Sequence, residues 1–162
     1  MVDTVAVGFP VVIPGGYAAL SGTQTFDGDK TFSGTTTLSG ATTVSGVATF
    51  SAAAVFSTMF KMPSATVAAA GSVQGDAAQI ATGFTLVSAA DGTKGVLLPA
   101  AAAGLVCFIK NNVAAALKIW PSTGDGINAV AVNSAFSITN LTSVTLIAYD
   151  ATTWYSIPLV AS

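Results

Sequence analysis

The chain has 162 residues, of which 52% are hydrophobic and only 7% are charged, and its formal net charge is −2. Every acid is Asp, every base is Lys, and there is no His. The absence of His excludes imidazole general bases, Ser-His-Asp and Cys-His arrangements and the common zinc sites. The five scattered Lys do not form the basic patch that nucleic-acid binding usually requires.

The hydrophobic content predicts neither a membrane span nor a secretion signal. The longest uncharged apolar stretch, residues 96–109, is interrupted by Pro99 and Gly104 and is shorter than the about 20 residues of a spanning helix. Near the N-terminus, Asp3 stands where a signal peptide carries positive charge. We expect the single Cys107 to be a small buried side chain without a disulfide.

Residues 1–19 are apolar, nearly uncharged and interrupted by Pro and Gly, which predicts an extended N-terminal arm. An extended apolar segment can add to a sheet edge or lie in a groove on a partner. The alternative is a strand that packs against its own assembly. The contact residues predicted for the arm are Val5, Val7, Phe9, Val11, Val12 and Ile13.

Residues 20–62 contain a repeat of the form Thr-apolar-Ser-Gly-x-x. Its apolar positions recur every six residues, at Leu20, Phe26, Phe32, Leu38, Val44, Phe50, Phe56 and Met62. Because six is even, an extended chain places the whole row on one face, whereas an α-helix would rotate the positions around its axis. The Ser-Gly pair of each unit predicts a bend between short extended segments.

Two architectures use such units: a single-chain β-helix, and a parallel trimer in which each chain contributes one apolar residue per level to a central seam. The repeat is short for a single-chain solenoid, whose ends need capping. A trimer closes its core at every level, and threefold symmetry brings identical side chains together. The trimeric stalk is therefore our prediction for residues 20–62, and a separately trimerising domain would fix its register.

The period is lost in residues 63–78, which we interpret as a linker of small residues. Residues 79–162 alternate strand-like runs with turn signals and predict an antiparallel β-sandwich or jelly-roll-like domain, so the expected fold class is all-β. The predicted strands are residues 81–88, 95–98, 105–110, 115–120, 127–132, 135–138, 143–149 and 153–157.

Candidate chemical sites are few. Asp27 and Asp29 resemble a fragment of a calcium loop but lack its further ligands, so an ion on a trimer axis stays open and we assign neither metal nor cofactor. The run from Asp91 to Gly95 lacks phosphate-loop spacing and predicts a hairpin turn. No pair of Asp residues is placed for catalysis by spacing, and we predict no enzyme. A sugar platform remains a candidate alongside core packing for Trp120, Trp154 and Tyr155.

These motifs carry a resemblance. Residues 83–104, 119–128 and 148–155 resemble a small β-rich module of tailed-bacteriophage virion proteins, and residues 24–34 are similar to the stalk repeats of phage head and tail fibres. The resemblance implies a homotrimeric capsid decoration, cement or head-fibre protein on the capsid exterior. Its partner would be the major capsid protein of a phage, contacted through the N-terminal arm.

Two alternatives belong to other classes. One is a tail-fibre or spike tip that binds host-surface glycan. The other is an ice-binding β-solenoid, for which the regular row of Thr25, Thr31, Thr37, Thr43 and Thr49 would have to form a flat exposed face.

Overall fold

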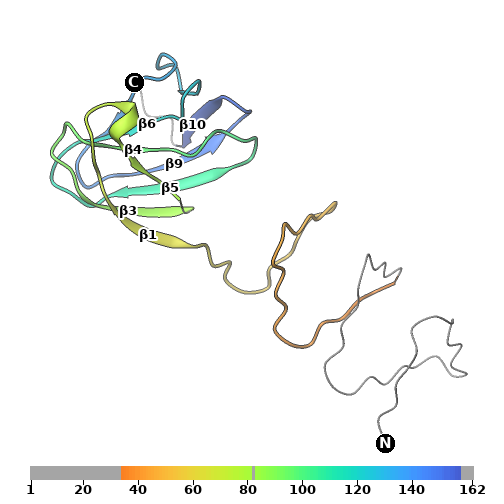
Figure 1. The fold of residues 1–162 in the computed structure, drawn as a ribbon. Helices are drawn as coiled ribbons and strands as arrows, with labels where there is room; N and C mark the ends of the chain where they lie inside the picture. The colour runs from red at the N-terminus through yellow and green to blue at the C-terminus, as the bar shows by residue number, and fades with distance from the viewer. Residues whose placement is uncertain (1–33, 82, 158–162) are drawn as a thin grey trace, which may run out of the picture. The chain divides into compact units, whose positions relative to one another are not determined.

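The computed structural model describes residues 34–81 and 83–157 and divides the chain into two units, residues 1–53 and 54–162 (Figure 1). The regular elements described are all β strands apart from a three-residue 3-10 turn, η1 (Gln74–Asp76), as expected for an all-β chain. Within these ranges, no helix is long and apolar enough to cross a membrane. Several predicted residues lie outside the described ranges: Val5, Val7, Phe9, Val11, Val12, Ile13, Leu20, Phe26, Asp27, Asp29 and Phe32.

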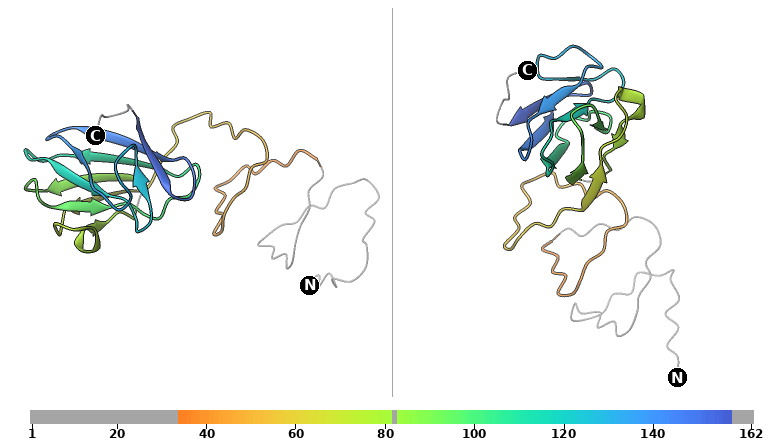
Figure 2. Two further views of the ribbon diagram at one scale, coloured as in Figure 1. Left: turned by 90° about the horizontal axis from the view of Figure 1, so that it is seen from above. Right: turned by 90° about the vertical axis from the view of Figure 1, so that its left-hand side faces the viewer.

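In the part of the chain that the structure describes, ten strands form two sheets, which Figures 1 and 2 show from three directions. The six-stranded sheet, sheet A, has the order β1-β3-β5-β9-β10-β7. Its strands are β1 (Ser64–Ala68), β3 (Phe84–Ala89), β5 (Val106–Asn111), β7 (Gly126–Ile127), β9 (Ser143–Ala148) and β10 (Thr153–Ile157). Sheet B has the order β2-β4-β6-β8, formed by β2 (Ala78–Gln79), β4 (Gly95–Leu97), β6 (Leu117–Trp120) and β8 (Phe136–Ile138).

The first six strands form a β-solenoid-like arrangement. The chain alternates between the sheets, so that β1, β3 and β5 lie parallel in sheet A while β2, β4 and β6 lie parallel in sheet B. Each successive pair of strands is one coil. Backbone hydrogen bonds also join the coils beyond the strand ends: the Ile80 N–H donates to the Leu97 carbonyl, and the Leu98 N–H donates to the Trp120 carbonyl, each at 2.9 Å.

Antiparallel strands complete the C-terminal side of the coils. Strand β9 pairs antiparallel with β5 in sheet A, and β8 pairs antiparallel with β6 in sheet B. Strand β10 then pairs antiparallel with β9 and parallel with β7. In both sheets the chain therefore runs back against the last coil.

The predicted antiparallel sandwich is not confirmed, because five of the eight described strand pairs are parallel. The reason lies in the turns. The turn at Asp91 leads from β3 in sheet A to β4 in sheet B, so it is a corner between sheets and the predicted hairpin is wrong. By contrast, the turn at Asp150 joins β9 to β10, which are antiparallel neighbours.

Part of the segment expected to be a linker is structured. Residues 64–68 form β1, which pairs parallel with β3, and η1 follows before β2. The register between β1 and β3 places Val67 beside Val87 on the inner side of sheet A. Although it consists of small residues, β1 is therefore the first strand of the solenoid-like arrangement and not a spacer.

The hydrophobic core lies between the two sheets. Strands alternate in burial, as period-two side-chain direction requires, so that Cys107 and Ile109 of β5 are buried while Phe108 between them is half-buried. The largest fully buried side chains are Trp154, Phe136, Leu98, Ile109, Leu117, Ile119, Ile127 and Leu146. Strands of both sheets contribute to the core. The alternate side chains of these strands therefore face outward.

Candidate interaction surfaces

Within residues 34–61, the apolar side chains of the six-residue row are exposed in the single chain. Leu38, Val44, Phe50 and Phe56 expose between 59% and 68% of their surface. Bends recur at residues 34, 40, 45–46, 51–52 and 57–58, which confirms the predicted bend after each apolar position. Exposed large apolar side chains in a regular row make this segment a candidate contact surface.

The units of the repeat do not pair with one another in the described part. Residues 34–63 contain no strand, and all residues from 34 to 61 are exposed. A hexapeptide β-helix formed by one chain would bury the row inside its coils, so these residues do not have that architecture in the single chain. The exposed backbone groups of these segments can hydrogen-bond to water, and they would need protein partners only if the segments became buried.

The end of the row behaves differently. Met62 is half-buried, and its terminal methyl group lies against Gly83, where a Cβ at that position would be. Just before it, the rings of Phe56 and Phe60 contact each other with centroids 5.3 Å apart. The backbone of Phe84 then donates a hydrogen bond to the Pro63 carbonyl. The last position of the row therefore adjoins the solenoid-like domain without a spacer.

The outer face of sheet A is a second apolar surface. Phe84, Phe108, Thr145 and Ile157 lie side by side across four neighbouring strands, because each is the register partner of the next. A parallel line of partners contains Val106, Ile147 and Tyr155. Three aromatic or apolar members are exposed: Phe84, Tyr155 and Ile157.

Tyr149 extends this surface at the end of β9. It is 72% exposed, and its ring meets the edge of the Tyr155 ring with centroids 6.0 Å apart. Sequence reasoning did not single out Tyr149 or Phe84. The signal was present in the Asp150 turn: a hairpin there puts position 149 opposite position 153, on the same face as position 155.

Of the two interpretations left open for Trp120, Trp154 and Tyr155, a shared sugar platform is not what the structure places together. Trp154 is 0% exposed and lies in the core, while its neighbour Tyr155 points to the opposite face of sheet A. Trp120 lies in the other sheet, beside Gly95, with the Lys118 Nζ 6.0 Å from its ring centroid. The three residues therefore present no common surface, and Trp154 is a core residue.

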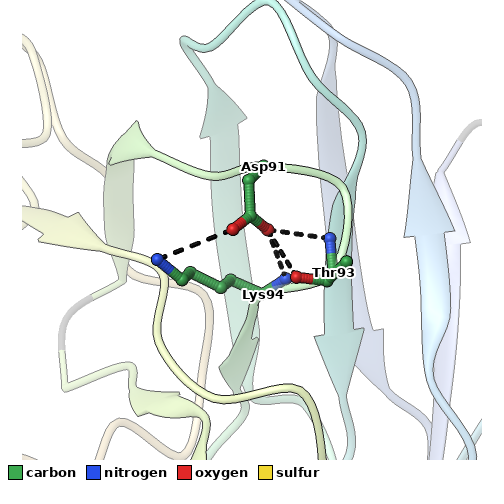
Figure 3. A network of polar contacts seen from close by, with 3 residues as sticks. All are labelled: Asp91, Thr93 and Lys94. Atoms are coloured by element: carbon green, nitrogen blue, oxygen red, sulfur yellow. Dashed lines mark hydrogen bonds and ion pairs between the residues drawn. The ribbon is translucent and has the colours of Figure 1, made fainter.

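The candidate turn carboxylates stabilise turns. Figure 3 shows Asp91 Oδ1 accepting hydrogen bonds from the Thr93 N–H at 2.9 Å, the Thr93 hydroxyl at 2.6 Å and the Lys94 N–H at 3.1 Å. The Lys94 Nζ lies 3.6 Å from the other carboxylate oxygen. These hydrogen bonds, those from Thr93 above all, hold the pKa of Asp91 well below its usual range.

Asp150 follows the same pattern. Its Oδ1 accepts hydrogen bonds from the N–H groups of Thr152 and Thr153, each at 2.8 Å, and they lower its pKa. In the described ranges, no group of three or more His, Cys, Asp or Glu side chains is placed to hold a metal ion. Both carboxylates therefore stabilise their own turns.

Cys107 is 3% exposed, as predicted, and burial raises the pKa of its thiol. It lines a small apolar cavity of about 220 Å³ together with Ile80, Ala81, Gly83, Pro99, Leu105 and Val106. Cys107 is the only lining residue with a titratable side chain, and its low thiolate content makes it a poor nucleophile. The cavity opens to the surface at Ala81 and Leu105, which are both exposed.

No protein-family model, curated protein sequence or solved structure matches this chain. The functional interpretation therefore depends on the two apolar surfaces and on the repeat itself.

Proposed function

We propose that the protein is a non-enzymatic virion structural protein, a homotrimer that decorates or cements the exterior of a tailed-phage capsid. The observation that carries the proposal is the exposed six-residue row, represented in the described part by Leu38, Val44, Phe50 and Phe56. Three parallel chains would bury one such side chain per level against its two copies. Burial of a Leu, Val or Phe side chain contributes about 1.5–3 kcal/mol, so each level favours association.

The bend spacing supports parallel, in-register chains. Each Ser-Gly or Ser-x bend closes one unit, so three identical chains bring equivalent residues to the same height. The extended segments between bends then hydrogen-bond to neighbouring chains instead of water. The stalk register is fixed by the solenoid-like domain, which begins directly after Met62.

The proposed capsid role is inferred from the resemblance of the repeat and of the turn motifs to phage virion proteins. An assembly protein needs surfaces rather than reactive groups. The side chains of Asp91 and Asp150 accept hydrogen bonds within their own turns, and that of Asp125 accepts one from the backbone N–H of Ala101 in another loop. The N-terminal arm, residues 1–19, is proposed as the capsid anchor because it is apolar and nearly uncharged.

The experiment is electron cryo-microscopy of an assembled particle that carries this chain. The proposal predicts threefold-symmetric density on the outside of the shell, with the solenoid-like domain outermost. Density confined to the tail would contradict the capsid role. Deletion of residues 2–14 should abolish co-sedimentation with the capsid, and unchanged co-sedimentation would show that the arm is not the anchor.

A fibre tip that binds host-surface glycan is the second candidate, and one observation favours it. Tyr149 and Tyr155 form an exposed aromatic pair, the kind of surface on which sugar rings stack. Binding to a glycan array that is lost in Tyr149→Ala, with retained folding, would favour this candidate over capsid decoration.

A further inference from the structure

The apolar cavity beside Cys107 lies where the chain crosses between the two sheets. Its lining comes from the segments that follow β2 and β4 in sheet B and from the segments that lead into β3 and β5 in sheet A. Ala81 and Leu105 are lining residues from two of these crossings, and both are exposed. A small molecule in solvent can therefore reach the cavity without unfolding of the domain.

The wall of the cavity carries no charge at neutral pH. Apart from Cys107, the lining residues are Gly, Pro or aliphatic. Burial raises the pKa of the Cys107 thiol, so this side chain keeps its proton and stays neutral. An ionic ligand would lose its hydration in this cavity without gaining an opposite charge. The lining therefore selects against charged molecules.

Backbone groups in the lining already have hydrogen-bond partners inside the fold. They are the N–H groups of Ile80 and Leu105 and the carbonyls of Gly83 and Leu105. Val106 and Cys107 pair with β9, and Pro99 has no N–H to donate. A buried water molecule needs about two to four polar partners, which these groups no longer offer. The wall therefore favours an apolar occupant over water.

The size of the cavity limits the ligand. Its volume is about 220 Å³. An apolar cavity of about 150 Å³ is large enough to hold benzene or xenon, whereas the pockets that bind drug-sized molecules measure about 300–1,000 Å³. The space therefore fits one aromatic ring or a short alkyl chain.

We propose that this cavity is a binding site for a neutral apolar molecule of the size of one aromatic ring. Ile80, Leu105 and Val106 supply the apolar contacts, and the exposed edge at Ala81 and Leu105 is the entrance. The site belongs to a single solenoid-like domain, so the inference goes beyond the proposed function and depends on neither the trimer nor the capsid role.

The test is a titration of the full-length chain with benzene, followed by NMR of its side-chain methyl groups. We expect the methyl signals of Ile80, Leu105 and Val106 to shift saturably. The signal of Ile138, a buried residue of β8 outside the lining, should stay in place. Pyridine is a polar ring of the same size. It should bind at least about tenfold more weakly, because its nitrogen would lose its hydrogen bond with water inside the cavity.

A pair of variants tests the place of binding. Ala81→Phe adds a ring at the entrance and should remove most of the benzene binding. Ala102→Phe adds the same ring at an exposed position outside the lining and should bind benzene as the parent chain does. The Ile138 methyl signal reports whether each variant is folded. The comparison of benzene with pyridine uses the parent chain alone, so it decides the question even where Ala81→Phe does not fold.

Three results would overturn the proposal. The first is the absence of saturable shifts at Ile80, Leu105 and Val106 up to the solubility limit of benzene. The second is equal affinity for benzene and pyridine, which would contradict the apolar class of ligand. The third is equal benzene binding by folded Ala81→Phe and Ala102→Phe, which would place the ligand elsewhere.

Discussion

Asp125 Oδ2 accepts a hydrogen bond at 2.9 Å from the backbone N–H of Ala101, which lies 24 positions earlier in the chain. Both residues are buried. The bond ties the loop before β7 to the connection between β4 and β5, so a single carboxylate joins two loops that belong to different parts of the fold. Sequence reasoning assigned Asp125 only to a turn, because the Gly on either side of it indicates local turn chemistry and nothing about a distant partner.

Asp125→Ala should lower the free energy of unfolding by about 1–3 kcal/mol, because it leaves the Ala101 N–H buried without its acceptor. Urea unfolding monitored by tryptophan fluorescence measures the change. Asp76→Ala, at an exposed position in η1, is the control and should stay within about 0.5 kcal/mol of the parent chain. Equal losses in the two variants would contradict the role given to Asp125.

Asn111→Ala should be destabilising to a similar or greater degree. The buried Asn111 side chain donates to the carbonyls of Ala115 and Thr139 at 2.8 and 3.0 Å and accepts from the Val113 N–H at 3.2 Å. Truncation leaves these groups without partners, which costs about 1–3 kcal/mol. The neighbouring exposed Asn112 supplies the control Asn112→Ala, which should leave the urea midpoint nearly unchanged. A smaller shift for Asn111→Ala than for Asn112→Ala would refute this assignment.

Gly71→Ala should lower stability by more than about 1 kcal/mol. Gly71 has φ +58°, and an added Cβ would overlap the backbone of Asp76 in η1. Gly75 provides a matched control within the same loop, because nothing lies within 4 Å of a Cβ added there. Differential scanning calorimetry should show a lower melting temperature for Gly71→Ala and a nearly unchanged one for Gly75→Ala. The reverse order would contradict the turn geometry.

Acid should remove the contribution of two turn carboxylates. The pKa values of Asp91 and Asp150 are lowered by hydrogen bonds in the folded chain, so these groups bind protons more readily when unfolded. Their stabilisation is fully present above the unfolded pKa of about 3.9 and is lost as pH falls towards the lower folded values.

The measurement is urea unfolding across this pH range for the parent chain and for Asp91→Asn combined with Asp150→Asn. Asn keeps a side-chain acceptor for the turn and cannot ionise. The variant should therefore lose less stability than the parent chain between neutral pH and about pH 2. Identical pH profiles would show that neither carboxylate couples folding to protonation.

The positions of the strands were predictable from the sequence, and their partners were not. Seven of the eight predicted segments match most of a strand, because runs of β-branched and aromatic residues between Gly, Asn and Asp turns are a local signal. The eighth, residues 127–132, is wrong beyond Ile127, since β7 ends there. Pairing is decided by where each turn directs the chain. Asp91-Gly92 and Asp150-Ala151 have similar local chemistry, yet the first is a corner between sheets and the second closes a hairpin.

Strand β1 and the sheet A face show the same limit. Residues 64–68 are small and weakly hydrophobic, and they form a strand because β3 supplies a parallel partner. The apolar outer face of sheet A contains Phe84, Phe108 and Ile157 from three separate strands, and only the strand register brings them together. The six-residue repeat is different, since its period, its bends and its row can all be read locally.

Phe50→Asp should weaken the trimer far more than Val47→Asp. Phe50 belongs to the six-residue row, whereas Val47 lies between two row positions and is 93% exposed in the single chain. Three carboxylates at one level of a closed seam would be buried without partners, which costs several kcal/mol. Analytical ultracentrifugation should show dissociation for Phe50→Asp and an unchanged trimer for Val47→Asp. Equal behaviour of the two variants would place the contact elsewhere.

The mass of the intact chain in solution tests the central claim most directly. Multi-angle light scattering should give three times the chain mass of 16.0 kDa, which is 48 kDa. A mass of 16.0 kDa at all accessible concentrations would contradict the trimer, because it would leave the exposed row of Leu38, Val44, Phe50 and Phe56 without the partner chains that the account requires.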